Sequence, residues 1–226
     1  MKYQAVIFDL YGTLVANFPE SEGNAVLKQV AAVLKVPSEN YISHWRAAYN
    51  ERMTGAHPDF RACIKNICQQ LGVQPTDDQI QAAASIRADM TWMEVMSYRE
   101  GALEVLSYLK DNGYKTGLIS NASMETTRVW PNTALAPLID TSVFSCIEGI
   151  LKPDPRIFQI VMERLAVSPE KCLYVADGMS RELTTASKLG MHSVLIKAPH
   201  DSAYEFDRED WSGPAISSLQ EIIDLL

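Results

Sequence analysis

The chain has 226 residues, of which 47% are apolar, and its 20 basic and 28 acidic side chains give a net charge of -8. This length suffices for one sizeable core, or for a core domain with a smaller insert. An acidic chain without a Lys/Arg cluster offers no surface for a polyanion, so nucleic acid is excluded as an expected partner.

The N-terminal residues predict a cytoplasmic protein. Met1 and Lys2 lead directly into a strand-like segment, without the zones of a signal peptide. The apolar runs are short and interrupted, so we expect no membrane span. The cysteines lie at no metal-ligand spacing, and we expect buried free thiols rather than disulfides. They are Cys63, Cys68, Cys146 and Cys172.

Short apolar runs predict five buried strands. These runs are 3–8, 115–120, 143–147, 172–176 and 192–196. Helical patterns lie between the later runs: "EGALEVLSYLKDNG" stops at Gly113, and "DPRIFQIVMERLAV" opens with Asp154 as N-cap and Pro155 at the first helical position. Strands that alternate with helices predict an α/β protein with a mostly parallel sheet and helices on both faces.

Between about residues 17 and 97 the alternation of strand and helix stops. Four stretches, "NAVLKQVAAVLKV", "SENYISHWRAAYNERMTG", "PDFRACIKNICQQLG" and "DDQIQAAASIRADMTWMEVM", have the apolar spacing of amphipathic helices and are separated by glycine and proline. We therefore predict two domains. The core comprises 1–16 and 98–226, and a helical domain comprises 17–97.

Polar side chains with catalytic potential stand at the ends of the predicted strands. They are Asp9 after the first strand, Ser120 and Asn121 after the second, Lys152 before a capped helix, and Asp177 with Glu182 after the fourth. Taken singly, each has a plainer interpretation: Asp9 can cap a turn with Thr13, and a lone lysine is usually a solvated charge. Together they share the carboxyl edge of the sheet, where α/β folds bind ligands, and so predict a chemical site.

The order of these motifs resembles the haloacid dehalogenase superfamily of hydrolases. The motifs are D-x-x-x-T after the first strand, then S-N, then K-P-D-P, then D-G-x-x-R-E, and the resemblance covers almost the whole chain. It implies a Rossmann-like core, and it implies that 17–97 is the α-helical cap domain that this family inserts after its first motif.

The resemblance also implies a role for each motif residue. Asp9 is similar to the nucleophile that forms an aspartyl intermediate, with Thr13 in the same motif, and Lys152 to the charge that balances it. Ser120, with Asn121 beside it, is similar to the ligand of a phosphate or carboxylate. The implied magnesium ligands are Asp9, the backbone carbonyl of Tyr11, Asp177 and Glu182.

Tyr11 leaves two enzymatic activities open. Phosphatases of the family carry a second aspartate two residues after the nucleophile, whereas 2-haloacid dehalogenases carry a tyrosine there, in a stretch very like "FDLYGTL". Arg46, in "HWRAAY", resembles the cap arginine that helps to bind the leaving halide. However, two features differ from the dehalogenases. They have a tyrosine at the position of Phe158, and their fourth motif is a Ser-Ser-Asn-type stretch where this chain has "ADGMSRE".

Charge counting favours the phosphatase. Three carboxylates against Lys152 alone cannot all stay ionised without another cation, and Mg²⁺ supplies it. A phosphate dianion also repels the Asp9 carboxylate, whereas a monoanionic haloacid has no comparable need for a cation. Because a phenol is a poor base at neutral pH, Tyr11 predicts a slow or specialised phosphatase of a small molecule. The alternatives are a metal-independent dehalogenase and a catalytically weakened binding protein, and the oligomeric state stays open.

Overall fold

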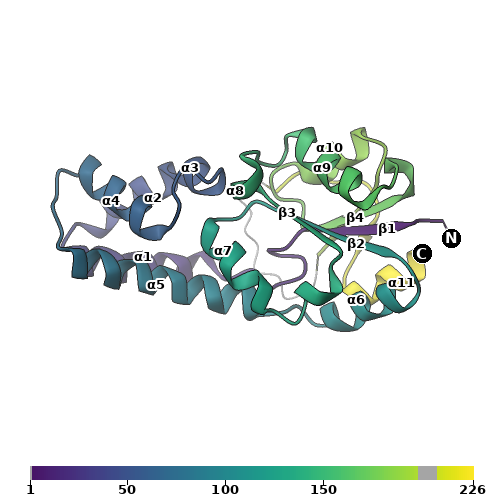
Figure 1. The fold of residues 1–226 in the computed structure, drawn as a ribbon, viewed down its shortest axis with the longest axis horizontal. Coiled ribbons are helices and arrows are strands. Elements are labelled where there is room, and N and C mark those ends of the chain that lie inside the picture. The colour runs from purple at the N-terminus through teal and green to yellow at the C-terminus, as the bar shows by residue number, and fades with distance from the viewer. Residues whose placement is uncertain (1, 198–207) are drawn as a thin grey trace.

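A six-stranded parallel sheet forms the centre of the protein, as a computed structural model that describes residues 2–197 and 208–226 shows (Figure 1). The strand order is β3-β2-β1-β4-β5-β6, and every pair is parallel. The strands are β1 (Ala5–Phe8), β2 (Lys115–Ser120), β3 (Thr141–Phe144), β4 (Cys172–Ala176), β5 (His192–Ile196) and β6 (Ala215–Ile216). The predicted α/β fold is confirmed.

Helices follow the strands and cover both faces of this sheet (Figure 1). They are α6 (Ala102–Asp111), α7 (Met124–Val129), α8 (Ser145–Glu148), α9 (Pro155–Leu165), α10 (Glu182–Lys188) and α11 (Ile222–Leu225). Short 3₁₀ turns lie at 130–132, 136–138, 169–171 and 219–221. Asp154 caps α9 as predicted, because its side chain accepts a hydrogen bond from the backbone N–H of Arg156.

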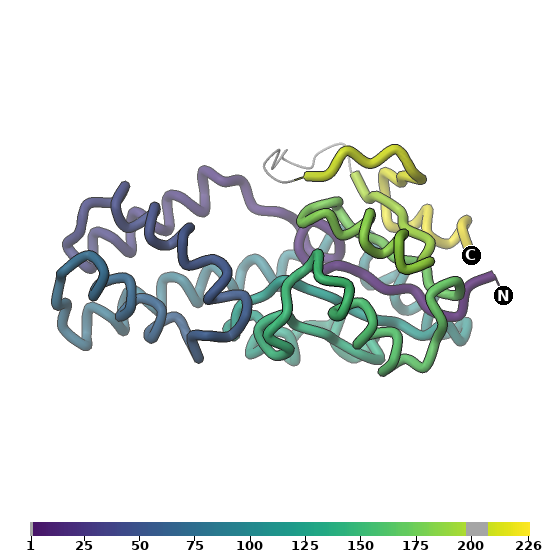
Figure 2. The backbone as a smooth tube through the Cα atoms, turned by 90° about the horizontal axis from the view of Figure 1, so that it is seen from above, coloured from purple at the N-terminus to yellow at the C-terminus, as the bar shows by residue number. Residues whose placement is uncertain are grey.

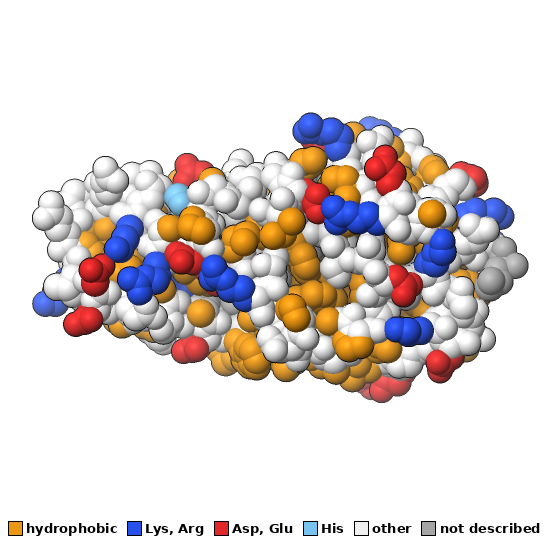
Figure 3. All heavy atoms as spheres, in the orientation of Figure 1, with side chains coloured by type: hydrophobic (Ala, Val, Ile, Leu, Met, Phe, Trp, Pro, Cys, Tyr) orange, Lys and Arg blue, Asp and Glu red, His pale blue; other side chains and the backbone are white. Residues whose placement is uncertain are grey.

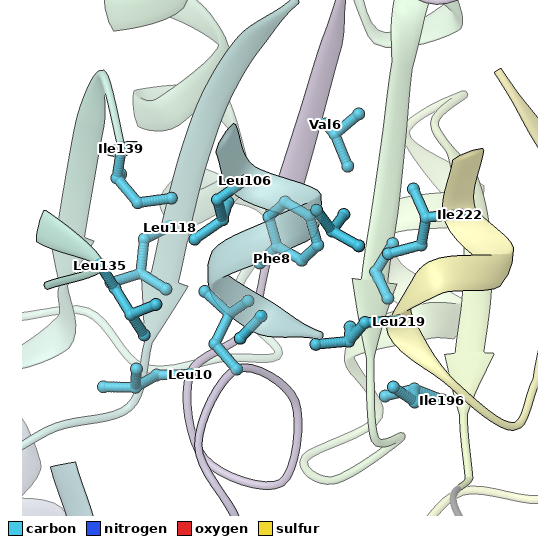
Figure 4. Packing of buried hydrophobic residues seen from close by; sticks show 14 of the residues in the cluster. Val6, Phe8, Leu10, Leu106, Leu118, Leu135, Ile139, Ile196, Leu219 and Ile222 are labelled. Carbon is cyan, nitrogen blue, oxygen red and sulfur yellow. The ribbon is translucent and has the colours of Figure 1, made fainter. Parts of the chain in front are cut away.

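Strand β1 shows how the sequence places two hydrophobic layers on one sheet. Successive side chains of a strand point to opposite faces. Val6 and Phe8 join the layer that α6 and α11 cover, where Figure 4 shows them beside Leu106 and Ile222. Ile7 faces the layer under α9 and α10. A strand buried on both faces needs a continuous apolar run, and β1 has one.

The pairing register brings the strand ends to one edge. Phe8 pairs with Leu118 on β2 and with Val175 on β4. The next residues along each strand therefore leave the sheet at the same level. Both chain ends lie at the end of the molecule opposite to the helices of residues 17–97, as Figure 2 shows.

Residues 17–97, here called the helical segment, contain five helices and their own hydrophobic cluster. The helices are α1 (Glu20–Leu34), α2 (Ser38–Ala47), α3 (Tyr49–Met53), α4 (Phe60–Gln70) and α5 (Asp77–Met96). The two longest, α1 and α5, run side by side in both views (Figures 1 and 2). The connections to the sheet also meet, because the N–H of Ala16 donates to the carbonyl of Ser97 at 2.9 Å. That the segment forms a separate domain stays a prediction.

The structure differs from the sequence-based expectation at three places. Strand β3 ends at Phe144, and the predicted strand residues 145–147 form α8, so Cys146 is helical. The stretch from residue 38 divides into α2 and α3 at Ala48. The two-residue strand β6 was not predicted, because two residues are too short for a periodic pattern.

Two further expectations concern the cysteines and the membrane. All four cysteines are free and buried, as predicted. Among the described residues, every helix is too short or too polar to span a bilayer.

Candidate active site

Asp9 leaves β1 at the carboxyl edge and is 5% exposed. Its backbone N–H donates to the carbonyl of Val175, and the hydroxyl of Thr13 donates to its Oδ2 at 3.4 Å. The turn that follows needs Gly12, whose φ of +76° is unfavourable for other residues. A Cβ there would also collide with the Oδ2 atom of Asp177. The turn thereby holds Asp9 beside Asp177.

Lys152 stands between two acids. Its ammonium donates to Oδ1 of Asp9 and to Oε2 of Glu182, the latter at 2.6 Å, and it also reaches the carbonyl of Ile119 at 3.3 Å. The side chain is only 4% exposed. Asn121 holds this lysine in place from both sides of its amide: Oδ1 accepts from the Lys152 N–H at 2.8 Å, and Nδ2 donates to the Lys152 carbonyl at 3.3 Å.

Asp177 and Glu182 complete a cluster of three buried carboxylates with Asp9. One oxygen of each lies within 4.8 Å of the others. Asp177 accepts hydrogen bonds from the Met179 N–H and from Nδ2 of Asn17, whereas the Oε1 atom of Glu182 is buried without a partner among the described residues. An unsatisfied buried oxygen of this kind costs about 1–3 kcal/mol, so Oε1 of Glu182 is a candidate ligand atom.

The cluster carries more negative charge than Lys152 can balance. Burial raises the pKa of Glu182 to about 8; Lys152 opposes this shift, whereas Asp9 and Asp177 add to it. Burial likewise raises the pKa of Asp9 to about 6, against the attraction of Lys152. Burial alone would lower the pKa of Lys152, but the two acids more than offset it and hold that pKa above its usual range. Without a further cation, one acid therefore keeps a proton near neutral pH.

We expect the metal-free protein to lose stability as the pH rises from about 4.5 to 8. Folded Glu182 and Asp9 keep their protons to higher pH than the unfolded chain does, so the native state binds more protons in this window. The stabilisation is complete below the unfolded pKa values and is lost above the folded ones. Urea denaturation in a chelator between pH 4.5 and 8.5 measures it.

The matched variant for this pH series is Glu182→Gln. This substitution removes the acid whose pKa is raised more. The unfolding free energy of the variant should therefore depend much less on pH over the same window. A wild-type stability that is flat or rises toward pH 8 contradicts the proposed protonation of the cluster.

Tyr11 and Ser120 lie at the same edge. The hydroxyl of Tyr11 shares a hydrogen bond with that of Thr126 at 2.9 Å, and burial raises the pKa of the phenol above its usual value. The Ser120 hydroxyl is fully buried and has no partner among the described residues. Because buried hydroxyls are normally hydrogen-bonded, this unpaired hydroxyl makes Ser120 a candidate ligand-binding group, although Ser120 is not among the residues that line the cavity described below.

Arg46 does not reach this site. Its guanidinium donates to Glu20 and Asn24 on the outer surface of the helical segment, and its side chain is 57% exposed. The expectation that Arg46 binds the substrate or a leaving halide is therefore not supported. The physical reason is helix orientation: its neighbour Trp45 packs inward, so Arg46 projects outward.

A cavity of about 290 Å³ lies between the carboxylate cluster and the helical segment. Asp9, Asp177, Glu182 and further core residues line one side, and residues of α2 to α5 line the other, among them Arg52 and Arg87. Figure 3 shows hydrophobic side chains gathered on the visible face where the two parts of the molecule meet. The helical segment thus contributes nine of the twenty residues that line the cavity.

Sequence reasoning missed both cavity arginines, although a signal for them exists. Arg52 stands seven residues after buried Trp45, a spacing that would place both on one face of the single helix predicted for this stretch, although the structure divides it at Ala48. Arg87 lies in the stripe of α5 that contains buried Ala84 and Thr91. A charged residue within an apolar stripe is the pattern that could have identified them.

Three supporting residues left no such signal. Asn17 donates to Oδ2 of Asp177 at 3.0 Å, and the Tyr174 hydroxyl donates to Oε2 of Glu182 at 2.7 Å. Arg99 donates to the backbone carbonyls of Gly12 and Thr13, the latter at 2.9 Å. These contacts join residues that lie far apart in the chain or on different elements, so only the fold reveals them.

Comparisons with known proteins give relatives among both phosphatases and dehalogenases. The chain is 25% identical to glyceraldehyde 3-phosphate phosphatase of Pyrococcus furiosus, with 100% of this chain and 93% of the relative covered. It is equally 25% identical to (S)-2-haloacid dehalogenase 1 of a Pseudomonas species, with 99% and 96% covered. Two further relatives are 30% and 33% identical to this chain over about half of its length. The matched part covers only 10% and 42% of the lengths of these two relatives.

Solved structures show the same fold. A HAD family enzyme of Bacteroides thetaiotaomicron, in complex with magnesium and inorganic phosphate, superimposes with a TM-score of 0.68 at 19% identity, over 90% of this chain and 99% of that one. The family model of haloacid dehalogenase-like hydrolases matches residues 3–190. With this match over most of its length, and with Asp9, Lys152, Asp177 and Glu182 gathered at one sheet edge, the chain belongs to the haloacid dehalogenase-like hydrolases.

Proposed function

We propose that the protein is a magnesium-dependent phosphatase that hydrolyses a small phosphate monoester through an aspartyl-phosphate on Asp9. The observation that carries the proposal is the cluster of three buried carboxylates with Lys152 as their only ion-pair partner among the described residues. Such a cluster calls for a divalent cation, and a phosphate dianion can approach a carboxylate only with one.

The cluster fits Mg²⁺. Carboxylate oxygens of Asp9, Asp177 and Glu182 lie within 4.8 Å of one another, and Oε1 of Glu182 lacks a partner. Hard oxygen ligands are those that Mg²⁺ takes, and the backbone carbonyl of Tyr11 would add one more. When bound, the ion would offset the repulsion between the Asp9 carboxylate and the phosphate.

The chain's own residues would divide the remaining work. Lys152 holds Oδ1 of Asp9, so Oδ2 is the oxygen that would attack phosphorus as the ester bond breaks. Ser120 would donate its free hydroxyl to a phosphate oxygen. Tyr11 would donate its proton to the leaving oxygen. Because its raised pKa makes the phenol a weak acid, this proton transfer would be slow, and the tyrosinate left behind would take a proton from the water of the second step.

The cavity suits a small substrate. Its volume of about 290 Å³ stands at the lower end of the range for ligand pockets. We infer that the helical segment acts as the cap, opening for the substrate and excluding water when closed. A cytoplasmic location stays a prediction of the sequence.

A 2-haloacid dehalogenase is the second candidate. Tyr11, which lines the cavity, and the similarity to (S)-2-haloacid dehalogenase 1 favour it. Against it stand the outward position of Arg46 and the acidic cluster, for which displacement of halide has no use.

A substrate screen decides between the two candidates. Phosphate esters and 2-chloropropionate are assayed for phosphate and halide release, each with magnesium and with a chelator. We expect phosphate release that depends on magnesium. Halide release that persists in the chelator, without any phosphate release, refutes the proposal, and release of neither product indicates a binding protein.

A further inference from the structure

Two arginines of the helical segment face the same cavity as Asp9. Arg52 comes from α3 and is 6% exposed, and Arg87 comes from α5 and is half-buried. The charge of Arg87 is felt at the Tyr11 hydroxyl, which lies near the catalytic edge. The phosphate-transfer chemistry proposed above uses neither arginine.

Aromatic rings hold both guanidinium groups. The Cζ atom of Arg52 lies 3.9 Å from the centre of the Trp45 ring, and that of Arg87 lies 4.9 Å from the same ring and 5.5 Å from the ring of Phe60. Arg52 also donates to the Trp45 carbonyl, and Arg87 donates to the sulfur of Met90 at 3.1 Å. Stacking of this kind orients a planar guanidinium and leaves its edge free for an anion.

Both groups keep unused donors. The Nε atoms of Arg52 and Arg87 are buried and have no hydrogen-bond partner among the described residues. Burial lowers the pKa of both, and the charge of Arg87 lowers that of Arg52 further. Two desolvated like charges with unsatisfied N–H groups are unfavourable alone and become favourable when an anion binds between them.

The net charge of the cavity lining that the helical segment contributes indicates which anion fits. Glu94 of α5 also lines the cavity, and it attracts Arg87 without forming an ion pair with it. Two guanidiniums and one carboxylate leave a single excess positive charge. A group with one negative charge balances this excess positive charge, whereas a second phosphate dianion would leave the site with a net negative charge.

We propose that Arg52 and Arg87 form a subsite for a carboxylate, so that the substrate is a small phosphate monoester with a carboxylate at its far end. This inference rests on the proposed phosphatase activity. The reacting phosphate lies at the Asp9 edge, and the carboxylate pairs with the guanidinium groups of Arg52 and Arg87.

The test compares paired esters on matched variants. The substrates are ω-phosphonooxy carboxylic acids of two to four carbons, each beside the alkyl phosphate in which a methyl group replaces the carboxylate. The proteins are the wild type, Arg87→Gln and the control Arg61→Gln. Arg61 lies on the neighbouring helix α4 and bonds Gln81, outside the cavity.

For Arg87→Gln we expect a loss of about 10- to 100-fold in kcat/KM for the best carboxylate ester, mostly through KM. The alkyl phosphates should change less than about threefold, and Arg61→Gln should change neither class. Equal losses for both classes would assign Arg87 to the reacting phosphate and overturn the proposal. So would a wild type that does not prefer the carboxylate esters.

A binding measurement separates this inference from the phosphatase activity. Phosphonoacetate and ethylphosphonate differ in the carboxylate and cannot be hydrolysed, so calorimetry reports the subsite without turnover. Tighter wild-type binding of phosphonoacetate that Arg87→Gln removes supports the subsite even if no ester is cleaved. If Arg87→Gln does not fold, Arg87→Lys replaces it, since it keeps the charge but loses the planar fork, and an unchanged preference in Arg87→Lys overturns the proposal.

Discussion

Asp9→Asn should reduce turnover of any substrate by at least about 10⁴-fold while the fold is retained. The amide has the shape of the carboxylate but cannot attack phosphorus or carbon, so the first covalent step is lost. Lys152 and Thr13 both donate hydrogen bonds to the Asp9 carboxylate, and the amide oxygen of asparagine can still accept one of them. The variant also relieves the excess negative charge of the cluster, which limits the loss of stability.

The measurement combines an activity assay with a thermal melt. The control is Asp89→Asn, since Asp89 is exposed on α5 and outside the cavity. It should retain full activity. Asp9→Asn activity within tenfold of the wild type would remove Asp9 as the nucleophile, whichever ester is used.

Removing magnesium should abolish phosphatase activity, and adding it should stabilise the protein. A ligand that binds only the native state stabilises it by about 2.7 kcal/mol at a hundredfold excess over its dissociation constant. Asp177→Asn takes one carboxylate from the cluster, so both effects should weaken strongly. In the metal-free protein this variant should change stability little, because relief of like-charge repulsion offsets the altered contacts to Asn17 and Met179.

Thermal melts and phosphate-release assays on the wild type, Asp177→Asn and Asp89→Asn, each with magnesium and with a chelator, test this. Halide release from 2-chloropropionate is followed in parallel. If the melt of the wild type does not shift with magnesium, and halide is released in the chelator, the magnesium-dependent phosphatase is ruled out. Tyr11 then becomes the residue that defines the activity.

The core of the fold could be predicted because its signals are local. Buried parallel strands read as unbroken apolar runs, and Asp154 with Pro155 marks a helix start. The site residues of the core could be predicted for a related reason. Asp9 and Asp177 each follow a strand directly, and parallel strands end at one edge of the sheet.

The helical segment allowed no such prediction for its pocket residues. Which side of an amphipathic helix faces a ligand depends on how the helix packs against the rest of the molecule, not on the pattern itself. Arg46 and Arg52 illustrate this. The resemblance to dehalogenases pointed to Arg46, but Trp45 packs inward and Arg46 faces solvent, whereas Arg52 stacks on Trp45 and lines the cavity.

The sequence by itself determined the α/β core, the family and the identity of the residues at the sheet edge, because strand ends and motif spacing are properties of neighbouring positions. The tertiary structure alone decided which atoms meet. It joins Lys152 to both Asp9 and Glu182, and it leaves an oxygen of Glu182 unsatisfied. Burial and long-range charge set these energies, and both arise only when distant segments of the chain pack together.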